Sequence, residues 1–177
     1  MSVSILGMSN IETRPVQGDL ALLQDLVAEM LLTTRTGAHL AYNWRDGTPR
    51  LVPMGFFWNG QEIVMATAVD SPKTKVLTDG AQVAVTIEGD GAPPKVLPIR
   101  GTVRVDTVEG IAPEYAAMIR KAEGEKRGNA LLEQWAPLYP RQTRIFIRPE
   151  WVGVLDFETR GPSAVERAAR RLMAEQG

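Results

Sequence analysis

Residues 39–69 read HLAYNWRDGTPRLVPMGFFWNGQEIVMATAV and contain the clearest strand and turn signals of the chain. Two short dipeptides, Asp46-Gly47 and Asn59-Gly60, separate three apolar runs within it. Both dipeptides favour tight hairpin turns, because Gly, Asn and Asp tolerate the positive φ that such turns require. The stretch therefore predicts three antiparallel strands in succession.

Alternation of apolar with small or polar residues continues beyond this stretch and predicts further strands at 81–89, 95–107 and 141–158. Gly101, inside the second of these runs, indicates a β-bulge or a close approach by another group. Pro53 lies inside a strand run and indicates an edge strand or a bulge. About six antiparallel strands joined early on by hairpins predict a mainly β fold, a small closed or half-open barrel with flanking helices.

Helical spacing of apolar residues appears in three segments, 18–37, 112–140 and 161–177. Asp19 is a suitable N-cap for the first, and Gly37 a suitable stop. The second contains glycines at 124 and 128, which predict a break into two helices. Alternating βαβ units and glycine-rich phosphate loops are absent, so a Rossmann or P-loop fold is excluded. We expect residues 1–17 to form an N-terminal arm and residues 18–177 one domain.

The composition excludes several classes of function. The 177 residues include 20 basic and 21 acidic ones, so no global positive field attracts nucleic acid or an anionic membrane. Cysteine is absent and His39 is the single histidine, which excludes thiolate chemistry and a site of several histidines. No apolar run approaches the roughly 20 residues of a transmembrane helix, and the N-terminus lacks the pattern of a signal peptide. These features predict a soluble, cytoplasmic protein that binds neither nucleic acid nor membrane.

Residues 70–80, DSPKTKVLTDG, directly follow the third apolar run. Ser71 suits an N-cap and Pro72 a first helical position, which predicts a short helix that ends near Asp79. Free backbone N–H groups at such a start, together with Lys73 and neighbouring hydroxyls, can bind a phosphate. A plain helix cap with solvated lysines gives the same pattern, so the local sequence alone leaves both interpretations open.

A family resemblance favours the phosphate interpretation. The order of the motifs DGTP (46–49), VPM (52–54), WNG (58–60), AT (66–67) and SPK (71–73) resembles the flavin-binding split β-barrel superfamily. This superfamily contains pyridoxamine 5′-phosphate oxidase-like proteins and deazaflavin (F420)-dependent oxidoreductases. The resemblance covers residues 20–105, and the C-terminal signature of the oxidase itself is not visible. It therefore implies a split β-barrel of the FMN-binding type rather than that particular enzyme.

The resemblance also implies a site. A cofactor phosphate would be held by Ser71, Lys73 and Lys75, with Arg50 as a second phosphate contact. The flavin ring would lie along one strand and its polar edge against another; the residues concerned are Val52, Pro53, Met54 and Gly55 on the first strand and Ala66, Thr67 and Ala68 on the second. Gly55 lets a flat ring approach the backbone closely.

In this superfamily a homodimer completes the pocket, and Trp135, Arg148, Trp151 and Arg160 are candidates for that partner role. The implied function is hydride or electron transfer between FMN and a small organic substrate, for which the cofactor supplies the chemistry. An F420-dependent reductase is one alternative, with Arg100 as an additional basic residue. A non-catalytic carrier or sensor of flavin or haem is another, and haem ligation would then fall on His39.

Overall fold

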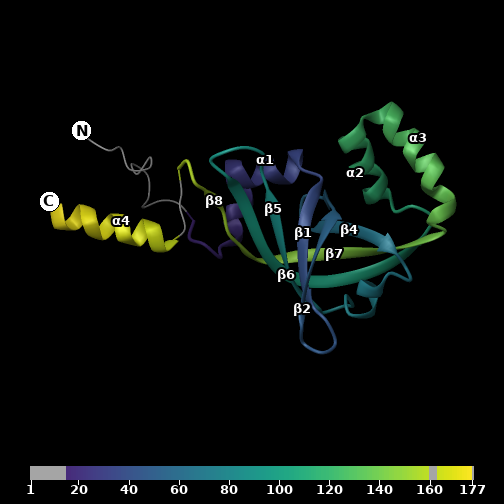
Figure 1. The fold of residues 1–177 in the computed structure, drawn as a ribbon, viewed down its shortest axis with the longest axis horizontal. Coiled ribbons are helices and arrows are strands. Elements are labelled where there is room, and N and C mark those ends of the chain that lie inside the picture. The colour runs from purple at the N-terminus through teal and green to yellow at the C-terminus, as the bar shows by residue number, and fades with distance from the viewer. Residues whose placement is uncertain (1–14, 160–162, 177) are drawn as a thin grey trace.

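The computed structural model describes residues 15–159 and 163–176. One antiparallel sheet curls into a half-barrel, with helices at its two ends (Figure 1). The sheet order is β2-β1-β5-β6-β7-β4-β3, and β8 pairs with β6 beside this path. The mainly β fold predicted from the sequence is thus confirmed.

All strands belong to this one sheet; their bounds are β1 Gly37–Asn43, β2 Pro49–Gly55, β3 Phe57–Trp58, β4 Ile63–Ala68, β5 Gln82–Glu88, β6 Lys95–Glu109, β7 Arg141–Val152 and β8 Leu155–Asp156. The helical elements flank it; they are η2 Leu20–Gln24, α1 Leu26–Thr34, η3 Pro72–Lys75, α2 Pro113–Glu123, α3 Glu125–Trp135, η4 Ala136–Leu138 and α4 Ser163–Gln176. Among the described residues, none of the helices is both long and apolar enough to span a membrane.

Both predicted hairpin turns are present, but the segment between them is not one strand. β2 pairs with β1, whereas β3 pairs with β4 on the other side of the sheet. The switch occurs at Phe56, whose side chain is 2% exposed and whose N–H donates to the carbonyl of Thr36 over 2.9 Å. The expectation of three successive paired strands was therefore wrong, because the alternation of apolar residues does not show which partner a strand takes.

The predicted helix at 18–37 is also interrupted. Asp19 caps the 3₁₀ helix η2, and its carboxylate accepts from the N–H of Ala21 over 2.9 Å. Asp25 then starts α1 by accepting from the N–H of Val27 over 3.0 Å. A second N-cap inside the segment explains the break, since a capping aspartate has extended rather than helical backbone.

The main core fills the inside of the half-barrel. It combines α1 with alternate residues of the strands; the fully buried large side chains include Leu31, Leu40, Met65, Ile87, Ile99 and Ile145. A smaller apolar cluster joins α2 to α3 through Met118, Ile119 and Leu132. These two helices cover the end of the sheet opposite α4 (Figure 1).

Gly101 forms the bulge that the sequence predicted. The register between β6 and β7 shifts between Arg100 and Gly101. A Cβ atom at Gly101 would lie 2.1 Å from the carbonyl oxygen of Arg148, a distance that no side chain can occupy. The absence of a side chain here allows the two longest strands to approach each other across the bulge.

We expect Gly101→Ala to lower the free energy of unfolding by about 3 kcal/mol or more, because the backbone of β7 must move to admit a methyl group. Urea unfolding followed by circular dichroism measures this. Gly37→Ala is the matched control, since a Cβ atom there meets nothing within 4 Å. Equal stability of the two variants would contradict the close approach.

Candidate functional site

Three of the residues proposed from the sequence meet at the end of β4. The ammonium of Lys73 donates to the hydroxyl of Ser71 over 2.8 Å and to the hydroxyl of Thr67 over 3.2 Å. Thr67 belongs to β4, whereas Ser71 and Lys73 belong to the turn and 3₁₀ helix that follow it. The chain thus folds back on itself to gather one cation and two hydroxyls.

The short helix differs in detail from the prediction. It is a 3₁₀ helix at Pro72–Lys75, and the side chain of Ser71 makes no capping hydrogen bond to its backbone. Thr74 instead ties the turn down by donating to the carbonyls of Val69 and Ser71, over 3.0 and 2.7 Å. The hydroxyl of Ser71 therefore faces Lys73 rather than the start of the helix.

Lys73 carries a charge that the described part of the chain does not neutralise. Within those residues it forms no ion pair, and its two hydrogen-bond partners are hydroxyls. Burial lowers the pKa of the Lys73 amine below its usual value, because the charged form loses water without gaining an anion. A half-buried ammonium beside two hydroxyls is a suitable site for a bound anion such as a phosphate.

An open groove of about 440 Å³ runs past this cluster. Its floor is formed by the end of β4 and the following turn, and its other wall by aromatic and amide side chains; the lining residues are Ala66, Thr67, Ala68, Asp70, Ser71, Pro72, Tyr115, Tyr139 and Gln142. We call this the β4 groove. The small side chains of Ala66 and Ala68 leave space above the strand for a ligand.

The aromatic wall is held in place by polar contacts between α2 and β7. Arg144 donates to Glu114 over 2.5 Å and to Asp106 over 3.1 Å. The rings of Tyr115 and Tyr139 lie 6.0 Å apart and are tilted by 54°. Burial raises the pKa of Tyr115, and neighbouring Tyr139 raises it further, so its phenol keeps its proton and can donate.

Gln142 lies buried in the same wall, with 0% of its surface exposed. Its side-chain oxygen accepts from the backbone N–H of Ala112 over 2.8 Å. The amide nitrogen, Nε2, has no hydrogen-bond partner among the described residues. Leaving a buried donor unpaired costs about 1–3 kcal/mol, which a ligand oxygen in the groove would recover.

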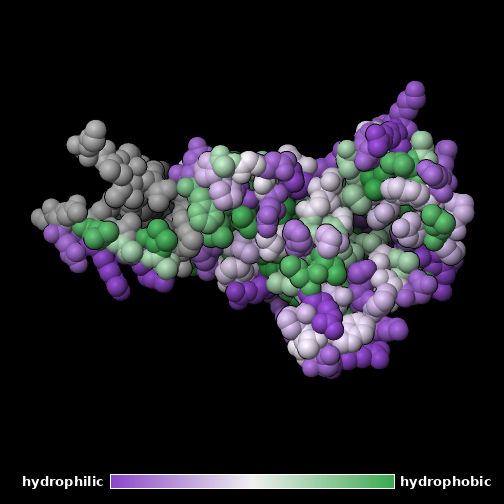
Figure 2. Space-filling model, in the orientation of Figure 1, coloured by the Kyte–Doolittle hydropathy of each residue, from purple (hydrophilic) through white to green (hydrophobic). Residues whose placement is uncertain are grey.

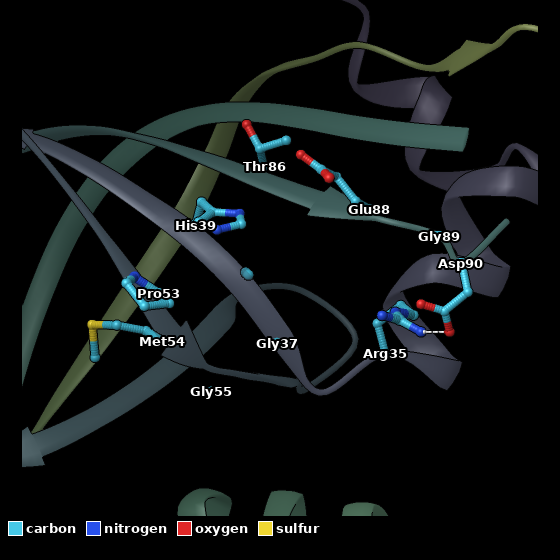
Figure 3. Close-up of a pocket in the computed structure, with 11 residues that line it drawn as sticks. Arg35, Gly37, His39, Pro53, Met54, Gly55, Thr86, Glu88, Gly89 and Asp90 are labelled. Carbon is cyan, nitrogen blue, oxygen red and sulfur yellow. Dashed lines mark hydrogen bonds and ion pairs between the residues drawn. The ribbon is translucent and has the colours of Figure 1, made fainter. Parts of the chain in front are cut away.

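The residues proposed to face the flavin ring from β2 lie elsewhere. Pro53, Met54 and Gly55 line a second groove of about 470 Å³, together with His39 and Thr86 (Figure 3). His39 is directly opposite Pro53 on one side and Thr86 on the other, so these three side chains share one face of the sheet. In the single chain, the proposed β2 residues therefore line a different groove from the β4 residues.

The other proposed residues take several positions. The side chain of Val52 packs against the main core, and Lys75 is exposed. Arg50 is also exposed, and it donates to the carbonyl of Pro49 over 3.4 Å.

The candidates for a partner role are spread over the molecule. Trp135 packs on the smaller apolar cluster, and the guanidinium of Arg100 lies 4.3 Å from the ring centre of Trp151. Arg148 pairs with Glu150 over 3.4 Å. Arg160 lies outside the described residues.

Sequence reasoning missed Tyr115, Tyr139 and Gln142. Gln142 alternates with Arg144 along β7, and such a polar row is typical of a solvent-facing side of a strand. Only the packing of α2 over this side buries the amide. The two tyrosines lie in the helical segment and in the loop after it, and no motif in the sequence points to them.

Comparisons with known proteins agree with this geometry at the level of the fold. No protein-family model matches the chain, and neither does any curated protein. A solved F420 reductase shares 22% identity with a TM-score of 0.54, covering 71% of this chain and 94% of that one. The FAD and heme binding protein from Mycobacterium smegmatis shares 21% with a TM-score of 0.52, covering 78% and 74%.

A third structure is a protein of the pyridoxinephosphate oxidase family from Clostridium acetobutylicum, related to general stress protein 26. It shares 14% identity with a TM-score of 0.53, covering 77% of this chain and 89% of that one. At these identities the likeness concerns the fold alone. The chain has the split β-barrel fold, as the resemblance in the sequence predicted.

The uncompensated charge of Lys73 gives a prediction for stability. Because burial lowers its pKa from 10.5, the unfolded chain binds more protons than the folded chain between the lowered value and 10.5. The contribution of this group to stability therefore rises with pH in that window and is least favourable below it. We expect Lys73→Met to melt at a higher temperature than the wild type at neutral pH. The difference between the two melting temperatures should narrow as the pH rises from the lowered pKa of Lys73 towards 10.5.

Thermal melting of the ligand-free protein across neutral to alkaline pH measures this gap. The exposed Lys75 offers a matched control, and Lys75→Met should leave the melting temperature unchanged throughout. A Lys73→Met variant that melts lower than the wild type at neutral pH would mean that the hydroxyl contacts outweigh the cost of burial.

Proposed function

We propose that this protein is an FMN-binding oxidoreductase that transfers hydride or electrons to or from a small organic substrate. The observation that carries the proposal is the cluster of Lys73, Ser71 and Thr67, in which a half-buried cation without a carboxylate lies beside two hydroxyls. Such a cluster suits the single phosphate of FMN.

The β4 groove fits the rest of such a cofactor. Ser71 lines it next to the cation, the small residues Ala66 and Ala68 leave space, and the opposite wall offers polar donors. Bound flavin would supply the redox chemistry, and the chain would supply binding, orientation and exclusion of water. No group of three or more acidic or histidine side chains within the described ranges could hold a metal ion.

We also infer that a second copy of the chain completes the site. Leu51 is 66% exposed on β2, directly opposite Ala41 of β1, and so offers an apolar surface for a partner. A homodimer would add the partner's residues to grooves that a single chain leaves open. Sedimentation of the flavin-bound protein would give twice the monomer mass of 19.4 kDa, and monomer mass would contradict this inference.

The double variant Ser71→Ala with Lys73→Met tests the phosphate site. We expect it to weaken FMN binding by roughly 10- to 100-fold, because charge-assisted hydrogen bonds contribute about 1.5–3 kcal/mol each. Riboflavin, which has no phosphate, should bind the variant and the wild type equally. Quenching of flavin fluorescence measures both affinities.

Lys75→Met is the control for this titration, because it removes an exposed lysine from the same 3₁₀ helix. It should affect FMN binding far less than the double variant. An unchanged FMN affinity in the double variant would reject the cluster as a phosphate site. Tighter binding of F420 than of FMN by the wild type would move the protein to the deazaflavin-dependent reductases.

A haem-binding function is the second candidate, and the exposed His39, which lines the second groove together with Pro53, Met54 and Gly55, favours it. Its imidazole lies on an open face between Pro53 and Thr86, where it could ligate an iron. If this function holds, added haemin gives a Soret band in the wild type, and His39→Ala shifts or abolishes that band. The same band in both proteins would remove His39 as the ligand.

A further inference from the structure

The β4 groove brings two kinds of polar group together beside the end of β4. Ser71, whose N–H donates to the carbonyl of Ala68, lies against the ammonium of Lys73. Gln142 is paired in register with Ala68, so their side chains project on the same side of the sheet. Tyr115 and Tyr139 line the groove with Gln142. The groove therefore has a cation beside it and neutral hydrogen-bond donors in its wall.

The orientation of the Gln142 amide follows from its one contact. The backbone N–H of Ala112 is a donor, so the atom that faces it over 2.8 Å must be the side-chain oxygen. The Nε2 donor is then the atom that lacks a partner, although the side chain is 0% exposed. Buried polar groups without partners are rare in folded proteins, and each calls for an explanation.

We propose that Gln142 binds a neutral oxygen of the ligand, a hydroxyl or carbonyl oxygen that lies beyond the phosphate. This inference rests on the proposed function, since it concerns the part of the cofactor that extends from the phosphate beside Lys73. Nε2 of Gln142 donates to that oxygen, and Tyr115 and Tyr139 line the same groove.

The charges in the groove favour a neutral oxygen over a second anion. None of the groove-lining residues in the described chain is a lysine or arginine, and Asp70 adds a negative charge at the rim. A carboxylate or phosphate beside Gln142 would meet the neutral donors that line the groove, because Arg144, two residues along β7, is already paired with Glu114 and Asp106. A sugar-like hydroxyl chain or a ring carbonyl would match these donors, because each accepts one or two neutral hydrogen bonds.

Gln142→Glu tests this role with little other change. The variant keeps an oxygen to accept from Ala112, and it replaces only the unpaired donor by a second oxygen. We expect it to weaken FMN and riboflavin binding by the same factor, roughly 10-fold at mildly alkaline pH, where the new carboxyl is ionised. Affinity should return as the pH falls and the carboxyl gains a proton that it can donate.

The control variant is Gln134→Glu, which adds the same charge at an exposed position of α3 and should change neither affinity. Tyr139→Phe is the second test, and it covers the case in which Gln142→Glu does not fold. It should weaken the binding of FMN and of riboflavin alike, by several-fold, because it removes a hydrogen-bond donor from the same wall of the groove.

The outcomes separate the inference from the proposed function. Equal loss for FMN and riboflavin supports the role of Gln142. Unchanged affinities, or a loss for FMN alone, would overturn it, while the phosphate cluster of Ser71 and Lys73 would stand. A wild type that binds neither flavin would reject the proposed function, and the inference would fall with it.

Discussion

The pairing of β6 with β7 is the contact on which the rest of the structure depends. The ladder runs from Ile99 opposite Val152 to Glu109 opposite Arg141, and the bulge at Gly101 bends it. One side of this ribbon carries β5, β1 and β2, and the other carries β4 and β3. The end of β4, and with it the groove, is placed by its register on β7. The hydropathy of the visible surface is mixed, as Figure 2 shows.

Lys73 and Arg144 differ in how their positive charge is neutralised. Arg144 is half-buried as well, but two carboxylates, those of Glu114 and Asp106, lie within 3.1 Å of it. Within the described ranges, the hydrogen-bond partners of the Lys73 ammonium are two hydroxyls. Folding alone gains little from such an arrangement, because desolvation of an unpaired cation is unfavourable. The phosphate of the proposed cofactor would neutralise Lys73, and a neutral oxygen of the same ligand would pair with Nε2 of Gln142 in the same groove.

The sequence was enough to predict those features that depend on local chemistry. The turns at Gly47 and Gly60 and the bulge at Gly101 follow from residue types and spacing. The division of the middle apolar run into β2 and β3 could not be predicted, because tertiary packing decides which strand each of them pairs with. Gln142 was missed for a similar reason: its strand face is polar in sequence, and it is buried because α2 packs over it.

Titration of the purified wild-type protein with FMN and with riboflavin would show whether a flavin binds with its phosphate on Lys73. Flavin fluorescence gives both affinities in the same buffer. We expect FMN to bind at least about 10-fold more tightly than riboflavin, through the charge-assisted contacts at the end of β4. Equal affinities, or no binding of either flavin, would contradict it.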